Sequence, residues 1–442
     1  MKILKYIIIM LCLSITIVVL TFENSKIEEN NYYAFYIGET PSDTAPASNS
    51  GYMFDHADCT NAANVVWDDV NWTAKITDLT TSRTKCTLYF KEDRRAATAI
   101  KNTIGDADPT STAVIDKGTD ASGCTNTLAY DDFGNLRYVG SNPCNYVTFN
   151  GETAGWRIIG VFNNQIKLIR NDSIGNYSWD TSASSVNNGY GINQWGESGT
   201  YTGADLMKLL NPGYETNLAE DASGNTISGT YANNSLYWNK GTGNCYNKRN
   251  NAYTTCDFSA TGLTESAKTM IANSTWNLGS QGSNDVWTNG NGLGLASKFY
   301  EYERSNNNGK ICSSGSYCND TVNRTTTWEG YVGLMYPSDY GYAVGGEART
   351  NCLANTNLYN YDTNNCYTND WLYKTSTYQW TLSPGAYSSR DNRVFYVVSG
   401  GRVYSYDAGY DYSVRPALFL KSSVERTGGS GTSTNPYTLS LD

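Results

Sequence analysis

Apolar and polar side chains alternate over residues 51–91, a pattern that predicts several short strands. Residues 156–162 and 166–170 form two apolar runs, and Asn163-Asn164 between them is a typical hairpin turn. Ser399-Gly400-Gly401 is a second hairpin signal. Further strands are predicted at 136–139, 146–149, 332–336, 371–372, 379–382, 394–398, 401–404 and 414–420.

Four segments are interpreted as helices instead, two of them because their apolar side chains recur at helical spacing. Residues 202–210 carry three leucines on one face, and Pro212-Gly213 ends the segment. Residues 263–272 follow the same spacing, with Thr264 as the N-cap. The other two helices are predicted at 91–105 and 295–304. Helices interspersed among many short strands predict an α+β fold.

The amino terminus has the order of an export signal. Lys2 and Lys5 precede an apolar run over residues 6–22. No small residues mark a cleavage site near its end, so the sequence predicts an uncleaved signal anchor over residues 1–22 that forms a single transmembrane helix. Basic flanks stay in the cytoplasm, which places the bulk of the protein outside the cell membrane. Cleavage of the signal would instead give a secreted protein.

Changes in composition predict the domain organisation. Residues 23–50 are polar, contain Pro and Ser clusters and are interpreted as a linker. A small all-β module follows at 51–91, and an Ala-, Thr-, Asp- and Gly-rich connector at 92–123. The strand and helix patterns then continue through one large domain at 124–424. The last segment, 425–442, begins with a Gly-rich stretch and is interpreted as a carboxyl-terminal tail.

The cysteines agree with an oxidising compartment. Of the 11 cysteines, Cys12 falls in the predicted anchor, and the other ten form an even set in an exported chain. The sequence has no C-x-x-C motif, so neither a zinc ribbon nor a thioredoxin site is supported. Free buried thiols remain the alternative to bridges. Pairing neighbours in sequence order predicts five disulfides: Cys59–Cys86, Cys124–Cys144, Cys245–Cys256, Cys312–Cys318 and Cys352–Cys366.

Charge and composition exclude several classes of function. The 442 residues carry a formal net charge of −10 with scattered Lys and Arg, which argues against a nucleic-acid partner. The sequence has a single histidine, His56, which excludes a metal site with several histidine ligands. Because His56 lies in the predicted small module, a Ser-His-Asp triad in the large domain is excluded as well. No phosphate-binding glycine motif is present. Charged residues make up 17% of the chain and aromatic residues 13%, which favours recognition by aromatic and amide groups.

The carboxyl-terminal third carries the densest motif. Residues 328–343 contain Leu334-Met335-Tyr336-Pro337-Ser338-Asp339-Tyr340-Gly341-Tyr342, and Val414-Arg415-Pro416 follows later. With these motifs, residues 124–442 resemble an uncharacterised surface-protein family of gut Firmicutes, which has no established activity. A weaker, fold-level resemblance links the Trp380-Thr381-Leu382-Ser383 segment and the Arg-Pro strand to C-type-lectin-like domains, which include formylglycine-generating enzymes. This second resemblance implies a C-type-lectin-like domain whose long, disulfide-tied loops carry the ligand site.

The sugar-binding motifs of C-type lectins are absent. Calcium-dependent members use Glu-Pro-Asn or Gln-Pro-Asp followed by Trp-Asn-Asp, and this sequence has neither. Calcium binds six to eight oxygen ligands, and loop carboxylates are the candidates to supply them. Solvated loop acids are the simpler interpretation, so no cofactor is expected. The carboxylates concerned are Asp339, Asp370, Asp391 and Asp411.

Aromatic side chains are the best candidates for ligand contact, because they supply contact area at a small entropic cost. Trp328, Trp371 and Trp380 lie in or beside predicted strands and are expected in the core. Tyrosines of the predicted loops are expected to be exposed and to bind the ligand. These are Tyr340, Tyr342, Tyr387, Tyr406, Tyr410 and Tyr412.

Charged residues give a weaker case for catalysis. Glu301 and Glu303 lie close together, as a glycosidase pair would, although an exposed helix face is the simpler interpretation. One of the two is expected to pair with Arg415. Cys352 and Cys366 do not match the placement of the cysteine pair in formylglycine-generating enzymes.

These observations predict an exported, membrane-anchored surface protein that binds an extracellular ligand, a glycan or a surface protein, without catalysis. Two alternatives stay open. One is a cell-envelope enzyme of the glycosidase or formylglycine-generating type. The other is a purely structural envelope spacer.

Overall fold

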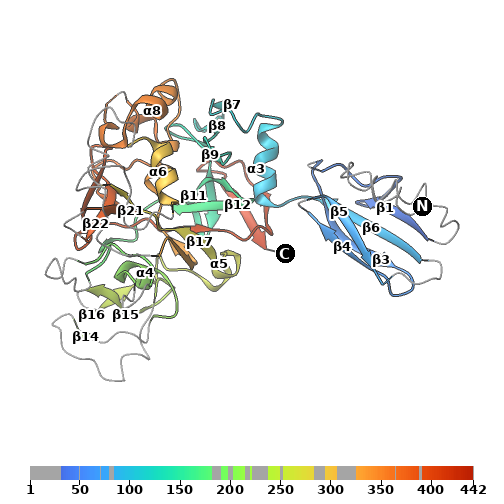
Figure 1. The fold of residues 1–442 in the computed structure, drawn as a ribbon, viewed down its shortest axis with the longest axis horizontal. Helices are drawn as coiled ribbons and strands as arrows, with labels where there is room; N and C mark the ends of the chain where they lie inside the picture. Colours follow the sequence, from blue (N-terminus) through green and yellow to red (C-terminus); the bar gives the residue numbers. More distant parts are fainter. Residues whose placement is uncertain are drawn as a thin grey trace, which may run out of the picture. The chain divides into compact units, whose positions relative to one another are not determined.

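A computed structural model describes residues 31–48, 50–69, 71–78, 84–181, 191–197, 203–214, 220–221, 237–248, 252–282, 294–305, 325–363, 365–387 and 391–441. The chain divides after Asn102 into two units (Figure 1). The predicted anchor and the Cys312–Cys318 pair lie outside the described residues. Within the described ranges, no helix is long and apolar enough to cross a membrane.

The amino-terminal unit is built from one sheet and one hairpin. The sheet has the order β2-β1-β6-β3, with β1 parallel to β6. The predicted strands over 51–91 are therefore present, but the interpretation of 23–50 as a linker is wrong for residues 31–42, which supply β1 and β2. The strands are β1 (Asn31–Ile37), β2 (Thr40–Ser42), β3 (Tyr52–Cys59), β4 (Asn64–Asp68), β5 (Thr73–Thr77) and β6 (Thr84–Glu92), with β4 and β5 forming the hairpin.

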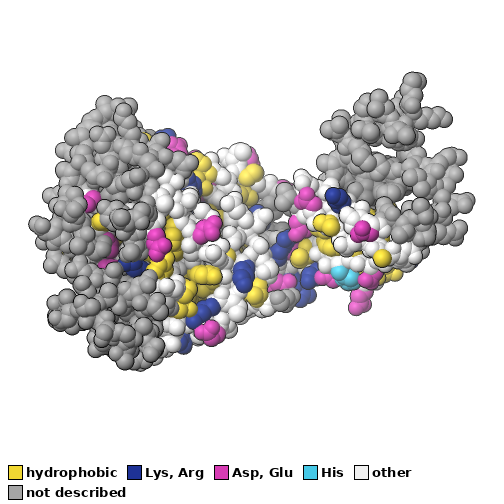
Figure 2. All heavy atoms as spheres, turned by 60° about the horizontal axis from the view of Figure 1, so that its bottom comes forward, with side chains coloured by type: hydrophobic (Ala, Val, Ile, Leu, Met, Phe, Trp, Pro, Cys, Tyr) yellow, Lys and Arg dark blue, Asp and Glu magenta, His cyan; other side chains and the backbone are white. Residues whose placement is uncertain are grey.

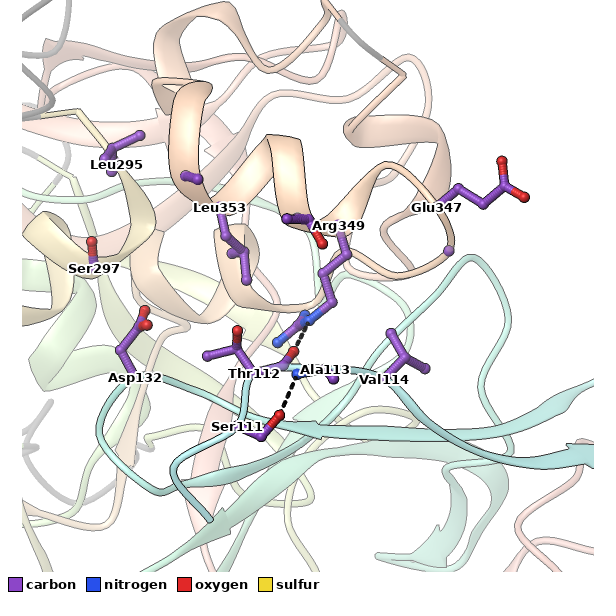
Figure 3. A pocket seen from close by; sticks show the side chains of 13 residues that line it. Ser111, Thr112, Ala113, Val114, Asp132, Leu295, Ser297, Glu347, Arg349 and Leu353 are labelled. Atoms are coloured by element: carbon purple, nitrogen blue, oxygen red, sulfur yellow. Dashed lines mark hydrogen bonds between the residues drawn. The ribbon is translucent and has the colours of Figure 1, made fainter. Parts of the chain in front are cut away.

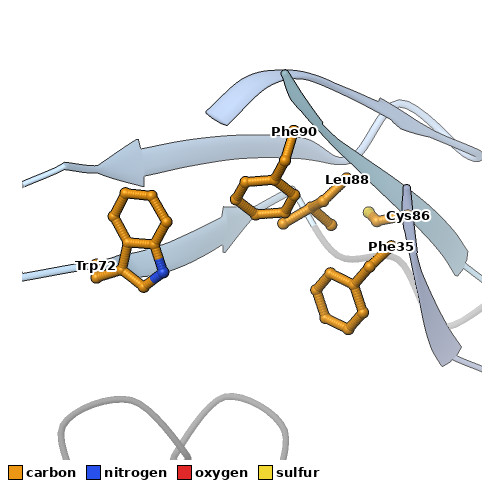
Figure 4. Packing of buried hydrophobic residues seen from close by; sticks show 5 residues of the cluster. All are labelled: Phe35, Trp72, Cys86, Leu88 and Phe90. Atoms are coloured by element: carbon orange, nitrogen blue, oxygen red, sulfur yellow. The ribbon is translucent and has the colours of Figure 1, made fainter. Parts of the chain in front are cut away.

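Figure 4 shows the side chains that form the core of this unit. Cys86, Leu88 and Phe90 alternate along β6 and therefore point to the same side of the sheet. Phe35 joins them from β1, and Trp72 from the turn between β4 and β5. The Trp72 indole N–H donates to the Pro46 carbonyl at 2.8 Å, which ties the segment after β2 to this core.

The Cys59–Cys86 disulfide joins β3 to β6 across 27 residues of sequence. Replacing both cysteines by serine is expected to lower the free energy of unfolding of this unit by about 3 kcal/mol, because the reduced chain regains loop entropy. Denaturant unfolding followed by tryptophan fluorescence measures the change. Cys352→Ser with Cys366→Ser, in the larger unit, is the matched control and is expected to leave the transition of the amino-terminal unit in place. An equal transition in the Cys59/Cys86 variant and the wild type contradicts the prediction.

The larger unit is built on a ten-stranded sheet. Its main path is β20-β25-β12-β11-β10-β27-β26, and β9 pairs with β11 and β8 (Figure 1). β27 lies parallel to β10, so the end of the chain closes against an early strand of the unit. The strands are β7 (Ile115–Thr119), β8 (Thr125–Tyr130), β9 (Leu136–Tyr138), β10 (Tyr146–Phe149), β11 (Glu152–Phe162), β12 (Gln165–Arg170), β20 (Val332–Gly333), β25 (Ala417–Phe419), β26 (Val424–Gly428) and β27 (Tyr437–Leu441).

A second sheet of six strands has the order β13-β24-β21-β22-β23, with β18 beside β21. Smaller pairings join β14, β16 and β15, and β17 with β19. The strands of the second sheet are β13 (Asn176–Ser178), β18 (Gln281–Gly282), β21 (Gln379–Ala386), β22 (Arg393–Val397), β23 (Val403–Asp407) and β24 (Asp411–Ser413). The smaller pairings use β14 (Glu220–Asp221), β15 (Thr242–Lys248), β16 (Ala252–Asp257), β17 (Ser274–Asn277) and β19 (Thr327–Gly330).

All four predicted helices are confirmed. They are α3, within which the unit boundary falls, and α4 to α6. The Thr264 hydroxyl accepts the Ala267 N–H at 3.2 Å, as expected of an N-cap. The helices in the described residues are α3 (Ala96–Ile104), α4 (Asp205–Leu210), α5 (Glu265–Met270), α6 (Ala296–Glu303), α7 (Pro337–Tyr342), α8 (Arg349–Asn355) and the short 3₁₀ turns η5 (Leu358–Asn360) and η6 (Tyr367–Asn369).

Several other sequence predictions are settled by this architecture. The β11–β12 hairpin is confirmed, with Asn163 and Asn164 at φ 47° and 62°, which asparagine tolerates better than most residues. The strand predicted at 332–336 stops at Gly333, because Pro337 opens α7, and 371–372 is not a strand. The interpretation of 425–442 as a tail is wrong, since β26 and β27 belong to the main sheet.

The described residues form a sheet-rich α+β structure with disulfides, as predicted. Four predicted pairs are bonded: Cys59–Cys86, Cys124–Cys144, Cys245–Cys256 and Cys352–Cys366.

Candidate functional site

Alternate residues of β22 and β23 point to one side of the second sheet. Tyr396 on β22 pairs with Tyr404 on β23, with ring centroids 6.2 Å apart. Tyr406 lies two residues further along β23 and so on the same side. The opposite side faces the core, where Phe395 and Ser405 are fully buried. Residues of β24 and of the turns beside it complete a surface that we call the tyrosine face: Tyr378, Tyr396, Tyr404, Tyr406, Tyr410 and Tyr412.

Tyr412 lies at the centre of the tyrosine face. Its ring centroid is 4.8 Å from that of Tyr396 and 5.3 Å from that of Tyr378. Tyr410 continues the series, 6.1 Å from Tyr412 and 4.7 Å from Tyr406. These separations are those of aromatic rings in direct contact. The six rings therefore form one continuous surface rather than separate exposed side chains.

The exposure of these rings varies across the face. Tyr378 and Tyr410 are 48% and 42% exposed, whereas Tyr396 is only 6% exposed and forms the floor. Burial raises the pKa of Tyr396 and of Tyr412, and a hydrogen bond between the two phenols acts on both values. Both phenols therefore remain protonated at neutral pH, when a phenol O–H can donate as well as accept a hydrogen bond.

The rim of the tyrosine face carries charges of both signs. The Arg393 guanidinium lies 5.2 Å from the centroid of the Tyr406 ring, and its Nε is 3.6 Å from a carboxylate oxygen of Asp407. On β24, Asp411 accepts the Ser178 hydroxyl at 2.6 Å. Charged groups of both signs therefore lie near the edge of the tyrosine face.

The structure brings together half of the tyrosines predicted to bind a ligand. Tyr406, Tyr410 and Tyr412 belong to the tyrosine face, and Tyr387 follows the end of β21, where it is partly buried. The expectation that Tyr340 and Tyr342 are exposed loop residues is wrong, because both lie in α7 and are fully buried. The reason is the short helix that begins at Pro337, which turns both rings into the core.

Sequence reasoning missed three members of the face: Tyr378, Tyr396 and Tyr404. Tyr404 alternates with Tyr406 on β23, and Tyr396 on β22 lies directly opposite Tyr404. The alternation of Tyr404 with Tyr406 was the available signal, since residues two apart on one strand share a face, whereas Tyr396 needed the register of the two strands. Tyr378 precedes β21 and carried no such signal.

The densest part of the sequence motif forms a buried charge network. The Arg137 guanidinium donates to one carboxylate oxygen of Asp339 at 2.7 Å, and the Lys167 ammonium to the other at 2.5 Å. Arg137 also binds Asp131 at 2.7 Å. All four side chains of this network are at most 1% exposed. The Lys167 ammonium also lies 4.2 Å from the centroid of the Tyr336 ring. The motif therefore holds the fold together at α7 and does not line the tyrosine face.

The network predicts a loss of stability in acid. Burial alone raises the pKa of Asp339, but Lys167 and Arg137 outweigh it and hold this pKa at about 2, below the ordinary 3.8. A lowered carboxyl pKa stabilises the fold above the unfolded value, and this contribution of about 2.5 kcal/mol is lost as the pH falls from about 4 to 2. The stability difference between the wild type and Asp339→Asn, from denaturant unfolding, should shrink over this range. A difference that stays constant contradicts the prediction.

The four aspartates considered for calcium do not gather at one place. Asp339 is committed to Arg137 and Lys167, and Asp370 is buried, where it accepts the Tyr361 hydroxyl at 3.0 Å. Asp391 is buried as well, and Asp411 is exposed beside Ser178. Across the described ranges, no group of three or more His, Cys, Asp or Glu side chains is placed to hold a metal ion.

The prediction that Glu301 or Glu303 pairs with Arg415 is wrong. Its guanidinium donates to the carbonyls of Arg170 and Leu372 and to the Gln379 side chain, all within 3.3 Å. Glu303 is instead buried against Ser338, whose hydroxyl donates to it at 2.5 Å.

Two further expectations concern helix α6 and the tryptophans. Glu301 is exposed and pairs with Lys298, so it does not share the buried environment of Glu303. Trp371 and Trp380 are core residues, as expected, whereas Trp328 is only partly buried.

Surface charge adds no further site on the face drawn in Figure 2, where basic and acidic side chains of the described residues are interspersed. The chemistry of the tyrosine face therefore follows from its own residues. Phenol rings offer apolar faces for stacking, phenol hydroxyls donate and accept, and charged groups of both signs lie nearby. Comparisons with protein-family models, with curated proteins and with solved structures find no match for this chain.

Proposed function

We propose that this protein binds an extracellular glycan through the tyrosine face, without catalysis. The observation that carries the proposal is the continuous series of tyrosine rings, two of which are more than 40% exposed. Sugar rings present apolar C–H faces that stack on aromatic rings, and their hydroxyls need donors and acceptors nearby. The face supplies both kinds of contact.

The proposed ligand is a chain of neutral sugars rather than a single charged unit. The rings extend over several neighbouring positions, from Tyr406 through Tyr410 and Tyr412 to Tyr396, which suits consecutive sugar residues. Arg393 is paired with Asp407 and so is not available as a lone cation for an acidic sugar. We place this binding surface in a C-type-lectin-like domain of a Firmicutes surface protein, with the segment 1–22 as its membrane anchor.

A glycan array with the oxidised full-length protein, in the presence and absence of EDTA, tests the proposal. Binding to neutral glycans that persists in EDTA is the expected result, because the face needs no metal. Binding that is lost in EDTA would point to a calcium-dependent lectin site instead. Absence of binding to every glycan would overturn the proposal and favour a protein ligand, an enzyme or a structural spacer.

A further inference from the structure

A separate cavity of about 660 Å³ lies in the larger unit, and no member of the tyrosine face lines it. The loop before β7 forms one wall, and the turn after β8 forms another. The start of α6 and residues along α8 close it from the other side, as Figure 3 shows. Its polar lining comprises Ser111, Thr112, Asp132, Ser297, Glu347, Arg349 and Thr350.

Arg349 braces this cavity and is not free to bind a ligand. Its Nε donates to the Thr112 carbonyl at 2.9 Å, and its Nη1 to the carbonyls of Tyr342 and Val344 at 2.9 and 2.6 Å. Its Nη2 donates to the Tyr130 carbonyl at 3.3 Å. The side chain is almost fully buried, so these carbonyls hold the guanidinium in place. An anionic ligand would find no uncommitted cation in this lining.

The two carboxylates of the lining, Asp132 and Glu347, are less constrained than Arg349. Asp132 accepts the Tyr342 hydroxyl at 2.5 Å, and its side chain points into the space between the helices in Figure 3. Glu347 stands at the edge of the cavity and points outward. Among the described residues, neither carboxylate forms an ion pair with a Lys or Arg side chain. Asp132 is therefore the carboxylate that points into the cavity, where it can accept a hydrogen bond from a cationic ligand group.

An aromatic pair lies next to Asp132 in the sequence but outside the lining of the cavity. Phe133 directly follows Asp132 and is 41% exposed. Its ring is stacked on that of Tyr300 with centroids 4.0 Å apart, and Tyr300 lies one helical turn after Ser297 on α6. The Asn135 amide donates to the Tyr300 hydroxyl at 3.0 Å, which fixes the pair.

We propose that this cavity binds a small ligand that carries an ammonium group and several hydroxyls, the chemistry of an amino sugar with a free amine. Asp132 binds the ammonium group, and the Ser and Thr hydroxyls of the lining bind the sugar hydroxyls. Leu295, Leu353 and Ala354 of the lining offer apolar contacts for the sugar ring. A neutral sugar cannot form an ion pair with Asp132, and the carboxylate of an acidic sugar is repelled by Asp132.

Saturation-transfer NMR on the full-length protein tests the proposal with three probes: glucosamine, glucose and glucuronate. Glucosamine is expected to bind about tenfold more tightly than glucose, and glucuronate more weakly still. Asp132→Asn is expected to remove the preference for glucosamine. Asp116→Asn is the matched control, because Asp116 lies on β7 outside the cavity, and its preference should equal that of the wild type.

A second variant, Ala354→Trp, fills the cavity with a bulky ring at a position that lines it and is expected to abolish binding of glucosamine. Equal binding of glucosamine and glucose would overturn the proposal, as would an unchanged preference in Asp132→Asn. Binding of glucosamine that survives Ala354→Trp would place the ligand elsewhere and would also overturn it. The proposal does not rest on the tyrosine face, and variants of that face should leave this binding unchanged.

Discussion

Asp339→Asn is expected to lower the free energy of unfolding of the larger unit by about 3–5 kcal/mol, because it removes the carboxylate from two buried cations. Arg137 and Lys167 both donate to Asp339, and both are almost fully buried. Arg137 retains Asp131, but Lys167 has no other described carboxylate within ion-pair distance. Burial lowers the pKa of Lys167 to about 8, so the ammonium still carries its charge at neutral pH.

Denaturant unfolding followed by tryptophan fluorescence measures this loss. Asp116→Asn, an exposed aspartate of the same unit, is the matched control and should change the stability by less than about 0.5 kcal/mol. If Asp339→Asn does not fold, Lys167→Met provides a second test. It removes one cation together with its contact to the Tyr336 ring but leaves Asp339 paired with Arg137, so it should cost less than Asp339→Asn. Equal stability of Asp339→Asn and the wild type would contradict a structural role for the motif.

Tyr378→Ala combined with Tyr410→Ala is expected to weaken binding of a glycan identified on the array by about 10- to 100-fold. These are the most exposed rings of the tyrosine face, and both contact Tyr412. Truncation removes stacking area from each side of the central ring. Isothermal titration calorimetry of the double variant and the wild type measures the change in Kd.

Tyr331→Ala is the matched control for this experiment. Tyr331 is 41% exposed, close to the value for Tyr410, but lies beside β20 outside the tyrosine face. Its truncation should leave the Kd unchanged. Because all three tyrosines are exposed, the melting temperatures of the variants should stay close to that of the wild type. An equal loss of binding in Tyr331→Ala and the double variant would show that the tyrosine face is not the binding surface.

Sequence patterns predicted the secondary structure well where local rules decide it. The β11–β12 hairpin follows from its Asn163-Asn164 turn, and the start of α5 follows from the Thr264 cap. Neighbouring cysteines paired as expected where the structure describes them. Each of these features depends on residues close together in the sequence.

Features that depend on distant residues were not predictable in the same way. Residues 31–37 form a strand because they pair with β6, about fifty residues later, and their local composition resembles that of a linker. The local sequence predicted Asp339 to be a solvated carboxylate of a loop. It is buried instead, because Arg137 on β9 and Lys167 on β12 pair with it. The tyrosine face required the register of β22 and β23, which the spacing alone did not fix.

The most direct test of the central claim is an NMR spectrum of tyrosine rings, selectively labelled, with and without the glycan identified on the array. The resonances of Tyr378, Tyr410 and Tyr412 should shift on binding, while that of Tyr331 should not. Shifts confined to tyrosines outside the tyrosine face would contradict the account, and so would an array that yields no glycan to add.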